Sequence, residues 1–326
     1  MKKIMMFDTA IASLNMGDEI IRYSLQKNWP ELYSKNYIIT MPTHTPTFRW
    51  WQHYLAKGIR KYSDVDLSFV CGTNLLYTNM IRPNPAWNVF LPNVKLQRGV
   101  ICIGAGIGAN SENVNIYTKT LFRKILSKKY YHSVRDERTK LFLEQLGLKA
   151  INTGCPTLWG LTDDLCRNIP NNKSEDVVFT LTEYHSDIES DKLMINILLA
   201  NYKNLYFWPQ SIKDLTYLKQ ICPNVKIHVI PPNLMSYDRF LTNCNVDYVG
   251  NRLHGGIFSL QHKRRTLIIG IDYRAEEMHK SFSIPYLKRD DMSQLNDIIN
   301  SEWETRISGI DSDIISSWKR QFGISE

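Results

Sequence analysis

The feature that most restricts the fold is a strand–turn–helix–strand pattern between Val246 and Ile271. Residues Val246 to Val249 favour a short strand, and the glycine–asparagine pair that follows them is a turn signal. A helix is predicted to begin near Leu253. The next strand, Thr266 to Ile271, is almost entirely apolar, as expected for a strand that is buried on both faces of a parallel sheet. This pattern is typical of α/β folds, in which helices cover both faces of such a sheet.

The turn before this helix carries residues suited to a negatively charged ligand. They are Arg252, Leu253 and His254, followed by the pair Gly255 and Gly256. Ligands of open α/β sheets bind at the carboxyl ends of strands, where the free N–H groups of a helix start favour an anion. An arginine adds a bidentate partner for phosphate or carboxylate, a histidine can exchange a proton near neutral pH, and glycines allow close approach to the backbone. The alternative is a surface arginine and a capping histidine at an ordinary helix start.

Strands and helices alternate along the whole chain. Further strands are predicted at residues 3–7, 67–71, 100–103, 130–134, 177–181, 205–208 and 225–230, with helices between them. The polar, proline-containing segment 167–176 is the best candidate for a linker. We therefore expect an α/β fold of two doubly wound parallel-sheet domains, residues 1–166 and 177–300, which face a cleft suited to binding. Spaced apolar residues in 301–326 predict C-terminal helices that pack back on the body.

The chain is basic, with a net charge of +8 over 326 residues. Such a charge favours anionic partners, which include phosphorylated small molecules, anionic lipid and nucleic acid. No nucleic-acid-binding module is recognisable in the sequence, so we do not expect a nucleic-acid partner. No metal-ligand spacing occurs either, and we expect no bound metal.

Cysteine usage and hydropathy predict a cytoplasmic protein. The six cysteines are scattered and form no C-x-x-C pair, which indicates free thiols in a reducing compartment. Asp8 interrupts the short apolar run at the N-terminus before a signal-peptide core could form. No run approaches the roughly 18 apolar residues that a membrane-spanning helix requires.

Residues 48–62 are predicted to form one helix with an apolar stripe and a basic, aromatic face. The stripe consists of Phe48, Trp51, Leu55, Ile59 and Tyr62, and the other side carries Arg49, Trp50, His53, Lys57, Arg60 and Lys61. One interpretation is a core-facing stripe with a solvated basic face. The other is a surface that contacts the inner face of the membrane, or a lipid-linked or phosphorylated acceptor.

Two more segments place charged residues beside helix starts. Asn15, Gly17, Asp18 and Glu19 lie in the motif NMGDE, just before or within the first turn of a predicted helix. Arg135 lies in the string SVRDERTKLFLEQLG, between a predicted strand and a helix. The alternatives are an ordinary acidic helix N-terminus and an exposed ion pair of Arg135 with a neighbouring acidic residue.

These three segments, together with Asp272-Tyr273-Arg274 behind the last strand, resemble the polysaccharide pyruvyl transferase family. The resemblance implies a GT-B-like fold. It also implies transfer of a pyruvyl group from phosphoenolpyruvate to a sugar of a cell-surface polysaccharide or of its lipid-linked precursor, with formation of a ketal. In the loop around Gly72, Cys71 and Thr73-Asn74 depart from the family pattern, which is richer in glycine there.

The resemblance further implies roles for individual residues at the donor. Arg135 and Arg252 would bind the phosphate and the carboxylate of phosphoenolpyruvate, which suit two arginines. The backbone N–H of Leu253 would bind an anionic oxygen, and His254 would protonate the methylene carbon.

On the acceptor side, Asp18 or Glu19 would act as the base, and Asn15 and Gly17 would belong to the substrate-binding loop. Phosphoenolpyruvate is the donor substrate, so no cofactor is expected.

Two other functions fit the same observations. A GT-B glycosyltransferase that uses a nucleotide sugar would share the cleft, the helix N-terminus and the basic residues. A non-enzymatic protein that binds anionic surfaces would use the net charge alone and would bind with steep salt dependence.

Overall fold

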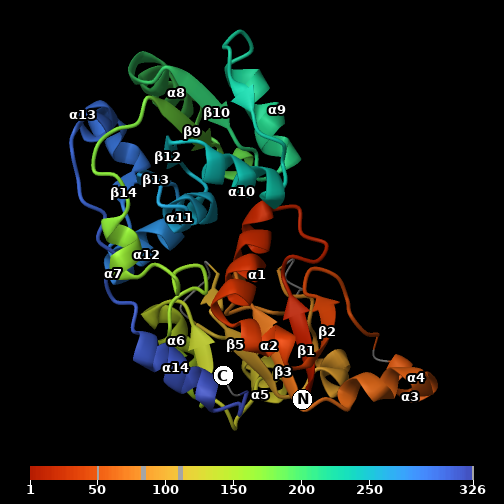
Figure 1. Ribbon diagram of the computed structural model, residues 1–326. Helices are drawn as coiled ribbons and strands as arrows, with labels where there is room; N and C mark the ends of the chain where they lie inside the picture. The colour runs from red at the N-terminus through yellow and green to blue at the C-terminus, as the bar shows by residue number, and fades with distance from the viewer. Residues whose placement is uncertain (50, 82–85, 109–112, 325–326) are drawn as a thin grey trace. The chain divides into compact units, whose positions relative to one another are not determined.

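The chain folds into two compact units, each built from segments that are separate in sequence. The structure, a computed structural model, describes residues 1–49, 51–81, 86–108 and 113–324 (Figure 1). Unit 1 comprises Met1–Ser13, Ile21–Trp159 and Asp311–Glu326. Unit 2 comprises Leu14–Ile20 and Gly160–Ile310. Both are α/β units built on parallel sheets.

The main sheet of unit 1 has four parallel strands in the order β2-β1-β3-β5. They are β2 (Tyr37–Pro42), β1 (Lys3–Asp8), β3 (Leu67–Cys71) and β5 (Val100–Ile103). Met5 pairs with Ile39 on one side and with Ser68 on the other. All residues of β3 and β5 are buried, as expected for strands of a sheet that is covered on both faces.

Shorter elements complete unit 1. Two parallel strand pairs are β4 (Asn74–Leu76) with β6 (Gly106–Ile107), and β7 (His132–Val134) with β8 (Ala150–Asn152). The helices are α1 (Met16–Asn28), whose first turn belongs to unit 2, α2 (Pro30–Ser34), α3 (Gln52–Leu55), α4 (Lys57–Arg60), α5 (Ile116–Ile125), α6 (Glu137–Gln145) and α14 (Ser312–Arg320), with 3-10 turns η1 (Lys61–Ser63) and η2 (Leu91–Leu96). Helix α6 begins after Asp136 because that carboxylate accepts the N–H of Thr139 at 2.7 Å.

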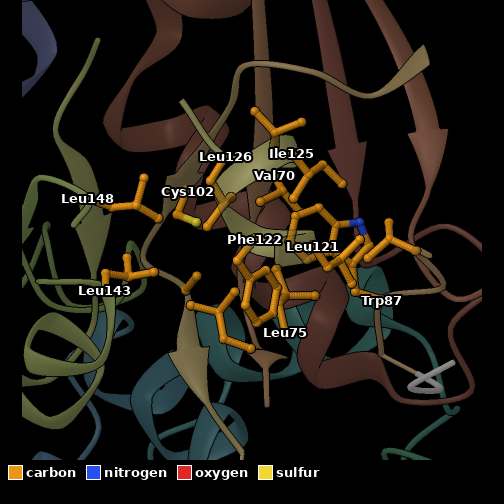
Figure 2. Packing of buried hydrophobic residues seen from close by; sticks show 14 of the residues in the cluster. Val70, Leu75, Trp87, Cys102, Leu121, Phe122, Ile125, Leu126, Leu143 and Leu148 are labelled. Carbon is orange, nitrogen blue, oxygen red and sulfur yellow. The ribbon is translucent and has the colours of Figure 1, made fainter. Parts of the chain in front are cut away.

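The core of unit 1 is apolar and aromatic. Figure 2 shows Phe122 and Leu121 of α5 with Val70 of β3 and Leu75 of β4. The rings of Trp87 and Phe122 stack with their centroids 6.4 Å apart. This packing holds α5 against the sheet through its apolar face.

The last helix, α14, packs on unit 1 through aromatic contacts. The ring centroids of Trp29 and Trp318 lie 5.5 Å apart, and those of Phe69 and Phe322 lie 5.0 Å apart. Unit 1 therefore draws part of its core from a segment about 150 residues further along the chain, after all of unit 2.

Unit 2 is built on six parallel strands in the order β11-β10-β9-β12-β13-β14. They are β9 (Asp176–Thr180), β10 (Asn204–Phe207), β11 (His228–Val229), β12 (Val246–Gly250), β13 (Thr266–Gly270) and β14 (Tyr286–Lys288). Numbered from the start of the unit, the order is 3-2-1-4-5-6, that of dinucleotide-binding doubly wound sheets. The order reverses between β9 and β12, and this switch point is where such sheets bind ligands.

Helices connect the strands of unit 2 or flank them in sequence. They are α7 (Asp163–Arg167), α8 (Ile188–Asn201), α9 (Ile212–Ile221), α10 (Leu234–Asn243), α11 (Leu253–Gln261), α12 (Tyr273–Phe282) and α13 (Leu295–Asn300), with 3-10 turns η3 (Glu183–His185) and η4 (Arg289–Gln294). Side-chain caps start most of them, for example Asp187 at α8 and Asn233 at α10. Figure 1 shows these helices arranged around the sheet of the unit.

A buried arginine joins distant segments of unit 2. Arg265 is 1% exposed, and its Nη1 donates to Oδ2 of Asp247 at 2.8 Å. Its other nitrogens donate to backbone carbonyl oxygens, at 3.1 Å to Asn171 and 2.7 Å to Ser301. The ring of Trp303 covers the guanidinium at 3.3 Å. Every part of this cation is therefore bonded or stacked, as a buried charge requires.

The boundaries of the two units differ from the predicted ones. The chain passes into unit 2 at Gly160, so the predicted linker 167–176 lies inside unit 2, where Arg265 binds the carbonyl of Asn171. Residues 301–310 contain no helix and belong to unit 2, whereas 311–326 belong to unit 1. Polarity alone did not reveal that this proline-containing segment is anchored by a buried cation.

The predicted single helix over residues 48–62 is wrong. Helices α3 and α4 have four residues each, and Ala56 between them is extended, with φ −106° and ψ 92°. Phe48, Ile59 and Tyr62 contact the core, whereas Leu55 is 78% exposed. Breaking the helix lets the later residues reach the core. Trp50 lies outside the described residues, and so do the side chains of His53 and Lys57.

All six cysteines lie in the described part of the chain and are free thiols, four of them buried, which confirms the prediction of unpaired cysteines. None of the described helices has the length and apolar character needed to cross a bilayer.

Candidate functional site

Polar side chains gather at the carboxyl edge of the unit 2 sheet, around the point where the strand order reverses. A cavity lies there with a free volume of about 20 Å³, which we call the switch-point cavity. Its walls are Asn15, Tyr184, Gln210, Asn251, Arg252, Leu253, His254, Ile271, Asp272, Arg274 and Ala275. All of these residues belong to unit 2. Four residues that were predicted from the sequence to belong to the site therefore line one cavity: Asn15, Arg252, Leu253 and His254.

Arg252 is held in a buried ion pair with Asp214. The two side chains are 4% and 0% exposed. Nη2 of Arg252 donates to both carboxylate oxygens, at 2.5 Å to Oδ2, and Nε donates to the carbonyl oxygen of Leu181 at 3.1 Å. The ring centroid of Tyr184 lies 4.9 Å from the guanidinium carbon. Among the described residues no partner is placed for Nη1, so this nitrogen is the one available to a ligand.

This ion pair argues against the expectation that Arg252 binds an anion through two parallel N–H groups. A bidentate contact uses two parallel N–H groups, and here Nε and Nη2 already serve protein oxygens. Asp214 also closes the capping box of α9 with Ser211 and accepts the N–H of Glu183 at 3.2 Å. The carboxylate therefore fixes Arg252 to two neighbouring loops.

The start of α11 has no side-chain cap. Its N-cap residue is Arg252, whose side chain makes no hydrogen bond to the first turn. Helices α9 and α12 of the same unit are capped by Ser211 and Asp272. The first-turn residues Leu253 and His254 both line the cavity, and His254 is 9% exposed. The positive end of this helix therefore lies at the cavity wall.

The glycine pair serves the packing of α11, and its predicted role in ligand approach stays a prediction. A Cβ at Gly255 would lie 2.5 Å from Nε2 of Gln210, and one at Gly256 would lie 2.6 Å from Cγ1 of Ile268. The lack of a side chain at Gly256 therefore lets α11 lie close to β13, and its lack at Gly255 lets α11 lie close to Gln210.

Arg274 forms a second ion pair at the cavity wall. Its Nε donates to Oδ2 of Asp272 at 2.9 Å, and its Nη2 donates to the hydroxyl of Tyr184 at 2.8 Å. Asp272 is the N-cap of α12. Burial raises the pKa of Asp272, but the hydrogen bonds and charge of Arg274 outweigh burial and lower this pKa below its usual range. Asp272 therefore stays ionised and holds Arg274 in place.

Asn251 links the cavity to a buried carboxylate. Its Nδ2 donates to Oδ1 of Asp191 at 3.3 Å, and the Tyr217 hydroxyl donates to Oδ2 of Asp191 at 2.7 Å. Burial raises the pKa of Asp191, while the hydrogen bond from Tyr217 opposes the rise. The side chain of Asn251 is thus oriented by groups behind the cavity wall.

The residue before α1, Asn15, lies in the cavity wall together with Gln210. The N–H of Met16 donates to the carbonyl of Gln210 at 2.9 Å, and Oδ1 of Asn15 accepts the N–H of Gly17 at 3.1 Å. A Cβ at Gly17 would lie 3.3 Å from Oε1 of Gln210. The loop residues Asn15 and Gly17 therefore both lie close to Gln210.

Asp18 and Glu19 do not line the cavity. Both belong to the first turn of α1, where acidic side chains match the helix dipole, and Asp18 is buried. Their assignment as the base stays a prediction.

Arg135 lies in unit 1, directly after β7, and is 3% exposed. Its Nη2 donates to Oδ1 of Asn74, and its Nε donates to Oδ2 of Asp136 at 3.3 Å. A side chain at Gly106 would collide with the guanidinium. Arg135 therefore forms the ion pair with Asp136 that was one of the two predicted arrangements, but this pair is buried rather than exposed. That Arg135 and Arg252 share one donor remains a prediction.

Sequence reasoning missed several residues of the site. They are Tyr184, Gln210, Asp214 and Asn251, and it assigned no role to Asp272 and Arg274, which it quoted only as part of the family signature. Each follows the carboxyl end of a strand or caps the helix that comes next. Scanning every strand end of the second domain for polar residues would have found most of them.

The arrangement can hold an anion beside a proton donor. Nη1 of Arg252, Arg274 and the uncapped helix start supply positive charge, and His254 supplies a titratable ring. No group of three or more His, Cys, Asp or Glu side chains is placed to hold a metal ion among the described residues.

Comparison with known proteins identifies the relatives of this chain. The sequence model of the family described as polysaccharide pyruvyl transferase matches residues 15–273. That span includes Asn15, Arg135, Arg252 and His254. The comparison with curated proteins finds no match.

Solved structures with a similar fold are UDP-GlcNAc 2-epimerases. One, from Neisseria meningitidis and bound to UDP-GlcNAc, is 13% identical, with a TM-score of 0.50 over 98% of this chain and 100% of that one. A second UDP-N-acetylglucosamine 2-epimerase is 9% identical, with a TM-score of 0.51 over 100% of this chain and 97% of that one. These similarities confirm the predicted fold class, a GT-B-like fold of two Rossmann-like domains.

Proposed function

The chain belongs to the polysaccharide pyruvyl transferase family and is a transferase, and we propose that its donor is phosphoenolpyruvate and its product a pyruvyl ketal. The acceptor is a sugar of a cell-surface polysaccharide or of its lipid-linked precursor. The observation that carries the proposal is the uncapped start of α11, where Arg252, Leu253 and His254 meet in one cavity with Arg274.

The proposed reaction balances without a cofactor. A proton adds to the methylene carbon of phosphoenolpyruvate, which makes C2 electrophilic. One sugar hydroxyl attacks C2 and loses its proton, and the C2–O bond to phosphate breaks. A second hydroxyl of the same sugar then bonds to C2, and its proton leaves with the phosphate. One phosphoenolpyruvate and one diol thus give one ketal and one hydrogen phosphate.

The residues of the cavity suit the anionic donor. Nη1 of Arg252 and the N–H of Leu253 would bind phosphate or carboxylate oxygens, and Arg274 would supply a second cation. Arg135 would bind a further oxygen of the donor. His254 would donate the proton to the methylene carbon as a general acid. Asp18 or Glu19 would accept the proton of the attacking hydroxyl.

The cavity is small for this donor. Its free volume of about 20 Å³ holds little more than one water molecule. Binding of phosphoenolpyruvate would therefore require a side chain to move, and Tyr184 is the wall residue best placed to do so because it is 50% exposed. A Tyr184→Ala variant would bind the donor faster if that movement limits entry.

The second candidate is a GT-B glycosyltransferase that uses a nucleotide sugar. It is favoured by the 3-2-1-4-5-6 strand order of unit 2, which is common to dinucleotide-binding sheets. A ligand that binds the folded chain raises its melting temperature. Phosphoenolpyruvate and UDP-sugars at equal concentration therefore separate the two candidates.

The decisive experiment is phosphate release from phosphoenolpyruvate with a panel of lipid-linked and nitrophenyl sugars. Release that depends on both the sugar and His254 supports the proposal. A melting temperature raised by a UDP-sugar and not by phosphoenolpyruvate, with no phosphate release, would favour the glycosyltransferase.

We also propose that the enzyme is cytoplasmic and contacts the inner face of the membrane through the segment around α3. Tyr54 and Leu55 are exposed there, and Trp51 is partly exposed, with Arg49, Arg60 and Lys61 nearby in sequence. Exposed aromatic and basic side chains together suit the interface of an anionic bilayer. Sedimentation with anionic vesicles tests this contact, and a Trp51→Ser/Leu55→Ser variant should lose it.

A further inference from the structure

Two carboxamide side chains in the switch-point cavity carry buried atoms without a partner. Gln210 is 2% exposed and Asn251 is 5% exposed. The atoms are Nε2 of Gln210 and Oδ1 of Asn251, which have no hydrogen bond to any described residue. Leaving a buried polar atom unpaired destabilises the folded chain. Two of them in the wall of one cavity indicate a ligand that pairs with both.

The hydrogen bonds behind the wall decide which atom of Asn251 is left for that ligand. Oδ1 of Asp191 accepts from Nδ2 of Asn251, and Oδ2 of Asp191 accepts from the Tyr217 hydroxyl. The amide nitrogen of Asn251 is thus engaged with a carboxylate. Its oxygen Oδ1 is an acceptor and needs a donor from the ligand.

The ligand group must therefore donate to Asn251 and accept from Gln210. The ionised phosphate and carboxylate of phosphoenolpyruvate only accept hydrogen bonds, so they cannot pair with Oδ1 of Asn251. A hydroxyl group both donates and accepts. The free volume of about 20 Å³ also matches a group the size of one hydroxyl.

We infer that Gln210 and Asn251 form a hydroxyl-binding subsite, which holds a hydroxyl of the sugar acceptor beside Arg252 and His254. The identity of that ligand as a sugar rests on the proposed function. A carboxamide does not take a proton in the reaction, so Gln210 and Asn251 are both positioning residues. Recognition of the acceptor is thereby assigned to the ends of β10 and β12.

Direct binding tests the subsite without requiring turnover. Calorimetry measures the affinity of p-nitrophenyl hexopyranosides, of their monodeoxy analogues and of phosphoenolpyruvate. The variants are Gln210→Met and Asn251→Leu, which keep size and remove the polar atoms. Gln210→Glu, which keeps the shape and replaces the donor nitrogen by oxygen, serves if the first variant does not fold.

Thr182→Val is the matched control. Oγ1 of Thr182 is also buried without a partner among the described residues and lies at the same edge of the sheet, but Thr182 does not line the cavity. This variant removes an unpaired polar atom without touching the subsite, so its sugar affinity should equal that of the unaltered chain.

The expected result is a loss of sugar affinity of tenfold or more in each subsite variant, with phosphoenolpyruvate affinity changed less than twofold. One deoxy analogue should bind the unaltered chain weakly and should be insensitive to the Asn251→Leu substitution. Unchanged sugar affinity in folded subsite variants, an equal loss for sugar and phosphoenolpyruvate, or no glycoside binding by the unaltered chain would overturn the inference. Sugar binding that needs both carboxamides, without phosphate release, would leave the subsite intact and contradict the pyruvyl transfer.

Discussion

Nη2 of Arg252 lies 2.5 Å from Oδ2 of Asp214, and both side chains are almost completely buried. The pair joins the end of β12 to the start of α9. Removing one member of a buried pair leaves an uncompensated charge, whereas removing both can be nearly neutral. A single substitution of Arg252 therefore changes stability as well as ligand binding, and the two effects must be separated.

A paired substitution separates them. Arg252→Met alone should lower the free energy of unfolding by about 3–5 kcal/mol, because Asp214 is left buried and unpaired. Arg252→Met/Asp214→Leu should recover part of that loss, because it removes the unpaired charge but also the hydrogen bonds that Asp214 accepts from Ser211 and Glu183. Its affinity for phosphoenolpyruvate should remain weaker by about 1.5–3 kcal/mol, the scale of a charged hydrogen bond. Urea denaturation and calorimetry measure the two quantities. A double variant with normal donor affinity would remove Arg252 from the donor site.

His254 is expected to affect turnover more than binding. His254→Gln should lower turnover by about 10²–10⁴-fold, the range for general acid catalysis, because the cations that hold the donor remain. The pH–rate profile should lose one limb. Near-normal turnover with an unchanged profile would show that His254 only completes the helix start.

Unit 1 should lose stability in mild acid through His132. Nδ1 of His132 accepts the N–H of Cys102 at 3.1 Å, and Nε2 donates to the carbonyl of Ser127, so the ring is neutral. Burial lowers the pKa of His132 from 6.5 to about 4, and the bond to Ser127 opposes this shift only in part. Between these pH values the unfolded chain binds more protons than the folded chain, so the free energy of unfolding falls as the pH falls.

The loss from His132 approaches a limit of about 3 kcal/mol near pH 4, from about 1.36 kcal/mol for each pH unit between the two pKa values. Urea denaturation between pH 7 and 4.5 measures it, with His132→Asn as the comparison that lacks the titrating group. Equal pH dependence in both chains, or an NMR titration of His132 near pH 6.5, would contradict the prediction.

Close packing of α11 predicts opposite effects for two glycines. Gly256→Ala should destabilise the protein by about 1–3 kcal/mol, because the new methyl group meets Ile268 and Tyr248 in the packed core. Gly58→Ala in α4 meets nothing within 4 Å and should be neutral or stabilising by up to about 1 kcal/mol. The melting temperatures of the two variants decide whether space or helix propensity controls these positions.

Sequence patterns predicted the buried strands well and one exposed segment poorly. The apolar run 266–271 corresponds closely to β13 (Thr266–Gly270), because a strand covered on both faces must be apolar throughout. The stripe in residues 48–62 has helical spacing, yet Ala56 is extended. Helical spacing shows that a segment could form an apolar helix face, but it does not show that a core is there to cover that face. Leu55 is exposed, so no core covers it.

The site could be predicted only where the chain marks it locally. Arg252 and His254 stand out because they follow a strand and begin a helix. The ionic partner of Arg252, Asp214, is 38 residues away, and Asp191 is 60 residues from Asn251. Such pairings depend on tertiary structure. The sequence therefore suggested that two N–H groups of Arg252 are free for a ligand, whereas in the structure Nε and Nη2 donate to protein oxygens.

The aromatic contacts of α14 have a consequence for biosynthesis. Residues up to Trp159 leave the ribosome first, but Trp29 and Phe69 receive Trp318 and Phe322 only after residue 311 has been made. At about 5–20 residues per second, the interval of about 150 residues corresponds to roughly 8–30 s. During that time the nascent N-terminal part exposes an aromatic surface that chaperones can bind. A stop codon in place of residue 311 would thus send the chain to degradation with the residues of the switch-point cavity intact.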